Sequence, residues 1–158
     1  MEIRPTEDFK GCSNTQPSRP LERRSTRHFA SCLAPNFSLA RAATGHCRSN
    51  PTTILGNKSE PQPDGCLYIV SEKGGQSFVS DDECLEGPPE FVVEISSSTE
   101  SIDLHAKLRD YERAGVCEYL VVAIRHQRIL WFELRDGKFE ELNSGEDGIH
   151  RSNVLPGL

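Results

Sequence analysis

Apolar runs separated by polar breaks predict the strands of the second half of the chain. These runs have strand length and are bounded mostly by Gly, Pro, Asn, Asp or Ser; they span residues 52–55, 66–70, 91–95, 119–124, 129–134 and 139–142. Asp136-Gly137 predicts a tight turn that joins the last two runs into a hairpin. The polar stretch 71–87 predicts a long loop with a short strand at 78–79.

One helix is predicted between the third and fourth of these runs. Small polar residues at 96–99 offer an N-cap, and Gly115 supplies a usual C-terminal stop. At about 100° per residue, Leu104, Leu108 and Tyr111 fall within about 60° of one another and form one buried stripe. The order β, β, α, β, β, β predicts a mixed α/β core.

The first 48 residues differ in composition from the rest. They are rich in Arg, Ser, Thr and Pro and contain eight Lys or Arg against four Asp or Glu, whereas residues 49–158 contain ten against twenty. We expect residues 1–48 to be an atypical basic segment, disordered or mistranslated, and residues 49–158 to form the folded domain. The segment is open to two interpretations, a nucleic-acid arm and a solvated tail. The acidic body argues against tight nucleic-acid binding by a monomer.

Cysteine spacing and hydropathy indicate the cellular setting. The six cysteines form no C-x-x-C pair, which is a poor pattern for zinc and for a disulfide framework. No apolar run reaches the length of a signal peptide or a membrane span. We therefore expect a soluble, reduced, cytoplasmic protein that does not bind a membrane.

A single glutamate interrupts the apolar run at 91–95. Burying the Glu94 carboxylate there would cost several kcal/mol unless a cation, a proton or strong hydrogen-bond donors compensate. Asp64 stands just before the run at 66–70, and Lys107 lies on the predicted helix. Two carboxylates at strand ends with a nearby lysine are typical of a Mg²⁺-dependent phosphodiesterase.

Several stretches, in order, resemble the Uma-two family, a bacterial family of restriction-endonuclease-like domains. The matching stretches are residues 60–64, 89–95, 103–108 with Tyr111, 114–116 with 118–119, and 147–149 with Ser152 and 155–158. The resemblance implies the PD-(D/E)XK nuclease fold, a mixed sheet flanked by helices. It also implies that Asp64 and Glu94 are the two acidic residues of the site. Ser96 stands where such nucleases usually carry a strand lysine, so Lys107 resembles a lysine moved onto the helix. Asp103 matches a further acidic position.

On this resemblance we expect a DNA endonuclease that uses Mg²⁺ (or Mn²⁺). Asp64 and Glu94 would be metal ligands and, with Lys107, catalytic residues, while Asp103 would hold Lys107 in place. Restriction-type nucleases are often homodimers, and we expect one here. The alternative is a non-catalytic remnant or protein-interaction domain on the same scaffold, because the N-terminal helix with which relatives begin is missing from the pattern. Taken singly, an Asp103–Lys107 helix pair is an ordinary i, i+4 contact.

Overall fold

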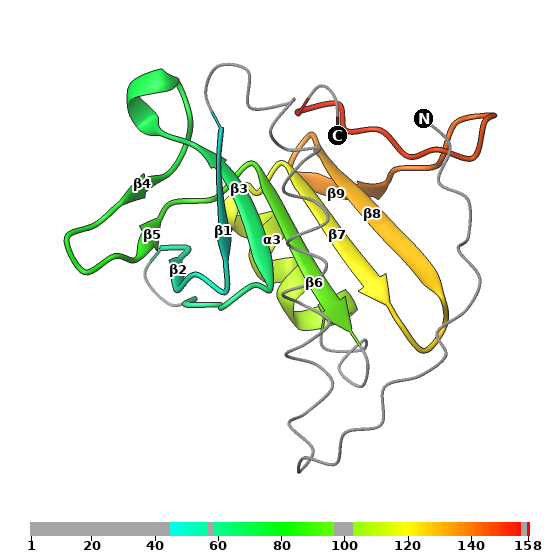
Figure 1. Cartoon of the computed structure of the whole chain (residues 1–158), viewed down its shortest axis with the longest axis horizontal. Coiled ribbons are helices and arrows are strands. Elements are labelled where there is room, and N and C mark those ends of the chain that lie inside the picture. The colour runs from blue at the N-terminus through cyan, green and yellow to red at the C-terminus, as the bar shows by residue number, and fades with distance from the viewer. Residues whose placement is uncertain (1–44, 57–58, 97–102, 156–157) are drawn as a thin grey trace, which may run out of the picture.

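A six-stranded mixed sheet forms the centre of the protein (Figure 1). The computed structural model describes residues 45–56, 59–96, 103–155 and 158. In spatial order the strands are β1 (Gly45–Ser49), β3 (Gly65–Ile69), β6 (Phe91–Ser96), β7 (Glu118–Ala123), β8 (Arg128–Arg135) and β9 (Lys138–Glu141). Strands β6 and β7 are parallel, and the other neighbours are antiparallel. The C-terminal ends of β6 and β7 therefore lie at the same end of the sheet as the N-terminal ends of β3 and β8. We call this end of the sheet the Glu94 edge.

Strand β1 was not predicted, and it moves the start of the sheet into the segment assigned to residues 1–48. It pairs with β3 from Gly45 opposite Ile69 to Ser49 opposite Gly65. None of its five residues is fully buried, because an edge strand contributes backbone hydrogen bonds without having to bury apolar side chains. Its sequence therefore lacks the apolar alternation that reveals a strand. The rest of the predicted basic segment, residues 1–44, lies outside the described residues.

A second, three-stranded sheet packs beside the first. It consists of β2 (Thr53–Ile54), β5 (Leu85–Glu86) and β4 (Phe78–Val79), in that order. The stretch 71–87, predicted as a loop with one short strand, thus also contains β5 and the 3₁₀ turn η1 (Ser71–Lys73). Two-residue strands depend on their partners rather than on local periodicity, which explains why β5 was missed.

The predicted helix covers one face of the large sheet. Its described part begins as a π-helical stretch, η2 (Asp103–Lys107), and continues as α3 (Leu108–Ala114). It ends at Gly115, whose φ of 89° is left-handed, as the sequence predicted. The predicted N-cap residues 97–99 lie outside the described residues, and Ser96 belongs to β6. The wider π turn replaces the α spacing that we assumed for residues 103–107.

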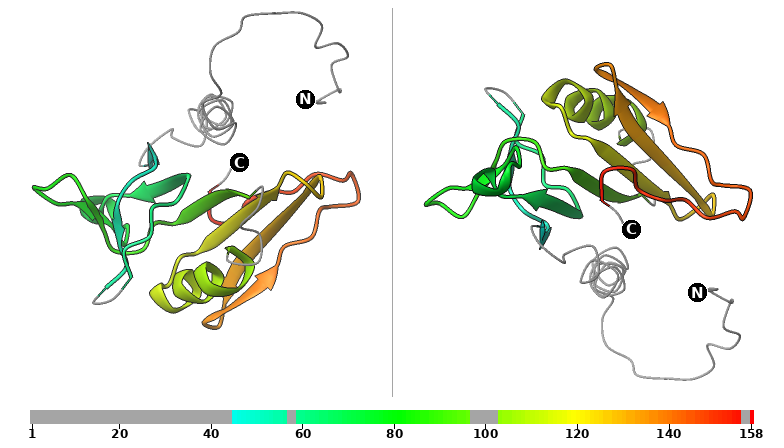
Figure 2. Two further views of the ribbon diagram at one scale, coloured as in Figure 1. Left: turned by 90° about the horizontal axis from the view of Figure 1, so that it is seen from below. Right: turned by 90° about the horizontal axis from the view of Figure 1, so that it is seen from above.

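Each face of the large sheet has its own apolar core. The helix face buries Tyr111 against Val92, Tyr119 and Val121. The opposite face buries a second cluster, which the C-terminal segment closes; it contains Leu67, Phe91, Val93, Leu120, Trp131 and Leu155. Figure 2 shows α3 on one side of the sheet and the C-terminal segment on the other. The mixed α/β architecture expected from the sequence is confirmed.

Candidate active site

Glu94 lies on the helix face of β6 and is only 3 % exposed. Its two carboxylate oxygens have different partners. The Tyr111 hydroxyl donates to Oε1 over 2.9 Å, and the Lys107 ammonium lies 3.0 Å from Oε2. Burial raises the pKa of Glu94 to about 7, although Lys107 and Tyr111 both act to lower it. Glu94 is therefore a carboxylate that can gain or lose its proton near neutral pH.

Lys107 bridges two buried carboxylates. Its Nζ lies 3.1 Å from Asp103 Oδ1 as well as 3.0 Å from Glu94, and 31 % of its side chain is exposed. Burial lowers the pKa of Lys107, but attraction to Glu94 and then Asp103 outweighs it and raises the pKa above its ordinary value. The ammonium is thus charged at neutral pH and remains accessible from outside.

Asp64 stands beside Glu94 across the boundary between β3 and β6. Gly65 pairs with Val93, so the antiparallel register places Asp64 opposite Glu94. The Ile95 backbone N–H donates to Asp64 Oδ2 over 2.7 Å. The Asp64 charge also acts to raise the pKa of Glu94, which indicates that the two carboxylates lie close enough to repel.

The structure therefore brings all four residues predicted from the sequence into one place, which we call the acid–lysine cluster: Asp64, Glu94, Asp103 and Lys107. Two of them come from neighbouring strand ends and two from one turn of the π-helix. The wide turn directs Asp103 inward, where it is fully buried, while Lys107 extends past it to Glu94. The fold thus supplies a lysine beside Glu94 although β6 itself carries none.

The donor set of this cluster fits a hard divalent cation. Mg²⁺ and Mn²⁺ prefer carboxylate oxygens, and Mg²⁺ usually keeps several waters, so two carboxylates are enough. Burial and the neighbouring Asp64 both disfavour the Glu94 anion, and a cation between the two carboxylates would relieve both costs. A carboxylate oxygen that accepts one hydrogen bond has a second lone pair for a metal. Among the described residues, no three or more His, Cys, Asp or Glu side chains are grouped as a metal site, so water would have to complete the coordination around the two carboxylates.

Tyr111 is a site residue that the sequence reasoning missed. We predicted it only as part of the apolar stripe, yet its hydroxyl holds one oxygen of Glu94. The neighbouring Tyr119 is equally buried, and its hydroxyl donates instead to the Asp103 carbonyl over 3.1 Å. The available signal was the residue type, because a fully buried stripe position that carries Tyr rather than Phe needs a hydrogen-bond partner.

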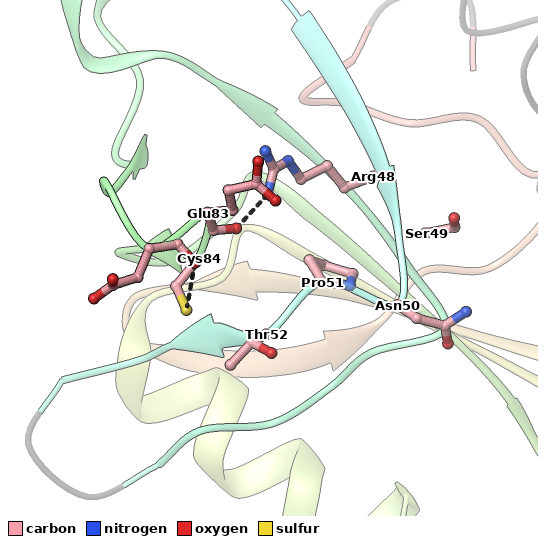
Figure 3. A pocket seen from close by; sticks show the side chains of 8 residues that line it. Arg48, Ser49, Asn50, Pro51, Thr52, Glu83 and Cys84 are labelled. Atoms are coloured by element: carbon pink, nitrogen blue, oxygen red, sulfur yellow. Dashed lines mark hydrogen bonds between the residues drawn. The ribbon is translucent and has the colours of Figure 1, made fainter.

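A separate polar pocket opens between the end of β1 with the residues that follow it and the turn at residues 82–84 (Figure 3). Residues 48–52 form one wall and residues 82–84 the other. Arg48 Nη1 donates to the Glu83 carbonyl over 2.6 Å and ties the walls together. Glu83 has a left-handed φ of 61°. Because Arg48 faces two acidic residues, Asp82 and Glu83, the pocket has mixed charge, and none of the four cluster residues lines it.

Comparison with known proteins agrees with this fold. The family model Uma2, described as "Putative restriction endonuclease", matches residues 14–158. That match begins inside the segment 1–48, which we expected to be disordered or mistranslated. The fold resembles the crystal structure of "a putative nuclease belonging to DUF820" from Anabaena variabilis ATCC 29413, with a TM-score of 0.62 and 12 % sequence identity. The likeness covers 89 % of this chain and 78 % of that one.

Two further comparisons complete the description. No curated protein matches the sequence. In the described part of the chain, no helix is long and apolar enough to cross a membrane. The family model matches most of the sequence, and the ordered motifs and the mixed sheet agree with it. This chain therefore belongs to the Uma2 family of restriction-endonuclease-like proteins.

Proposed function

We propose that the chain is a DNA endonuclease that hydrolyses phosphodiester bonds with Mg²⁺ or Mn²⁺. One observation carries the proposal: Asp64, Glu94 and Lys107, distant in sequence, meet at the Glu94 edge of a restriction-endonuclease-like sheet. The Lys107 ammonium is partly exposed, with 31 % of its side chain accessible, between two buried carboxylates. A nuclease needs such an arrangement, because its substrate is an anion that must approach a metal held by carboxylates.

Asp64 and Glu94 are the residues that would hold the metal. A bound divalent cation lowers the pKa of a water molecule and neutralises charge on the phosphate. The hydrogen bond from Tyr111 and the ion pair with Lys107 hold the two oxygens of Glu94 in one orientation. The Ile95 N–H does the same for Asp64. The chain thus orients its ligands before any substrate arrives.

Lys107 acts as a charge stabiliser in this proposal rather than as a base. Its raised pKa keeps it protonated at neutral pH, so it cannot accept a proton from water there. As an ammonium it can attract a phosphate oxygen and stabilise the negative charge that grows during hydrolysis. Asp103 holds the amine from the opposite side and limits its motion.

Plasmid cleavage by the full chain in Mg²⁺ or Mn²⁺ tests the proposal, with Lys107→Ala as the diagnostic variant. Losing this group should lower the cleavage rate by roughly 10²–10⁴-fold, the range for a positioned polar catalytic group. Lys138→Ala is the matched control, because Lys138 also forms an ion pair, 2.8 Å from Glu112, but lies outside the cluster. It should cleave like the wild type.

A folded wild-type chain that cuts neither plasmid nor single-stranded DNA would instead support the alternative, a non-catalytic remnant or interaction domain. Equal cleavage rates for the Lys107→Ala and wild-type chains would show that Lys107 is not a catalytic residue. Restriction-type nucleases are often homodimers because two strands must be cut, so we also propose a homodimer. Light scattering of the purified chain measures that state directly.

A further inference from the structure

Among the described residues, the turn between β7 and β8 is a basic feature outside the acid–lysine cluster. Its residues 124–129 are all exposed. From Tyr119 to Phe132 the sequence contains Arg125, His126 and Arg128 and no acidic residue. Residues 49–158 as a whole carry twice as many acidic as basic residues. An exposed basic turn therefore stands out on this acidic domain, and its position relative to the acid–lysine cluster bears on its function.

The register places this turn at the Glu94 edge. Ser96 pairs with Ala123, and Ala123 pairs with Arg128. Directly paired residues in a sheet point to the same face, and residues two apart on one strand also share a face. Arg128 therefore lies on the same face as Glu94, two strands away and one row further out. Strand spacing and rise put their Cα atoms roughly 12 Å apart.

The turn also has a defined backbone. Gln127 N–H donates to the Ile124 carbonyl over 3.2 Å, and Gln127 has a left-handed φ of 49°. Ile124 and Ile129 flank the arginines and are 42 % and 48 % exposed. Exposed apolar side chains beside arginines suit a nucleic-acid groove, where they contact sugars and base edges. The combination is thus both ordered and chemically suited to a polyanion.

We propose that residues 124–129 are a DNA-contacting element in which Arg125 and Arg128 bind backbone phosphates and so seat the strand over the acid–lysine cluster. The inference rests on the proposed nuclease function and adds the part of the protein that holds the substrate. It also accounts for DNA binding by an acidic domain, because a local basic turn, rather than net charge, supplies the phosphate contacts.

The salt dependence of DNA binding tests this directly. Full-length chains are titrated into a labelled duplex in EDTA between about 50 and 300 mM salt, and fluorescence anisotropy gives the affinity. Each phosphate contact contributes about 0.9 to the slope of log affinity against log salt concentration. The Arg125→Ala/Arg128→Ala pair should therefore lower the magnitude of the slope by about 1.8, and Arg125→Lys/Arg128→Lys should keep it.

The matched control is Arg135→Ala/Arg151→Ala, which removes the same charge from two exposed ion pairs elsewhere. Its slope should equal that of the wild type. An unchanged slope in the Arg125→Ala/Arg128→Ala pair, an equal fall in the control, or a wild type that does not bind would overturn the inference. If the double variant fails to fold, Arg125→Ala alone should lower the magnitude of the salt slope by about 0.9. An unchanged slope in that single variant would also contradict the inference.

Binding in EDTA is independent of cleavage, so the two proposals can fail separately. A chain that binds through this turn but never cuts contradicts the nuclease proposal alone. A chain that cuts DNA while the Arg125→Ala/Arg128→Ala pair keeps the wild-type slope contradicts only the assignment of the turn.

Discussion

Replacing Glu94 with glutamine should change how the stability of the protein depends on pH. Glu94 is buried, and its pKa of about 7 in the folded state lies above the ordinary value of 4.5. Between these two pH values the folded state binds more protons than the unfolded state. The contribution of Glu94 to stability is therefore fully present below pH 4.5 and is lost as the pH rises through about 7. This is the reverse of the usual behaviour of a salt-bridged carboxylate.

The size of the effect follows from the two pKa values. The gap between 4.5 and about 7, at about 1.36 kcal/mol per pKa unit, corresponds to roughly 3 kcal/mol. Relative to Glu94→Gln, the wild type should lose that much unfolding free energy between about pH 4 and pH 8. Lys107 does not contribute in this window, because its pKa is raised from 10.5 and so lies well above it.

Urea unfolding of both chains across this pH range measures the difference. Glu60→Gln serves as the control, because it removes the same charge from an exposed position. The difference in unfolding free energy between this variant and the wild type should change much less with pH. The reasoning that burial controls this carboxylate would be refuted if the unfolding free energy of the wild type, relative to Glu94→Gln, stayed constant or increased with pH. Mn²⁺ should restore much of the lost stability above pH 7 in the wild type alone, because a metal favours the anion.

Three other substitutions probe further buried groups. Tyr111→Phe and Tyr119→Phe should each lower the unfolding free energy measured in urea by about 1 kcal/mol. Only Tyr111→Phe removes the hydrogen-bond donor to Glu94. Calorimetry should therefore show a roughly 10–100-fold loss of Mn²⁺ affinity in that variant alone. Equal metal affinities would show that the hydroxyl does not position Glu94. Glu118→Ala removes the acceptor for the Trp131 indole and two backbone N–H groups of the C-terminal segment, which should cost roughly 3 kcal/mol or more. Fluorescence of Trp131, the single tryptophan, should shift to the red, and an unchanged spectrum would contradict this account.

Much of the fold was predictable because its signals are local. Five of the six predicted apolar runs became strands of the large sheet, and their bounds differ from the prediction by no more than one residue. The Asp136-Gly137 turn joins β8 and β9. Both turn residues have positive φ, at 49° and 78°, as a tight hairpin turn requires. The helix ends at Gly115 for the same kind of reason. The sixth run shortened to the two residues of β2.

The buried carboxylates show where local signals end. Glu94 stood out in the sequence because it interrupts an apolar run, whereas Glu90 and Glu118 lie at the ends of such runs and carried no comparable signal. In the structure Glu90 accepts from the backbone N–H groups of Ile69 and Gln76, and Glu118 holds the C-terminal segment. Their partners are 13 to 36 residues away along the chain.

Sequence alone thus determined most of the strands, the end of the helix and the acidic residue that needed compensation. Periodicity, turn chemistry and the cost of burying charge all act over a few residues. Tertiary structure decided the pairing of β1, the meeting of Asp64 with Glu94 and the second role of Tyr111. It also decided that Arg128 shares a face with Glu94. Each of these depends on strand order and register, and many different registers satisfy the same local pattern until the whole sheet is assembled.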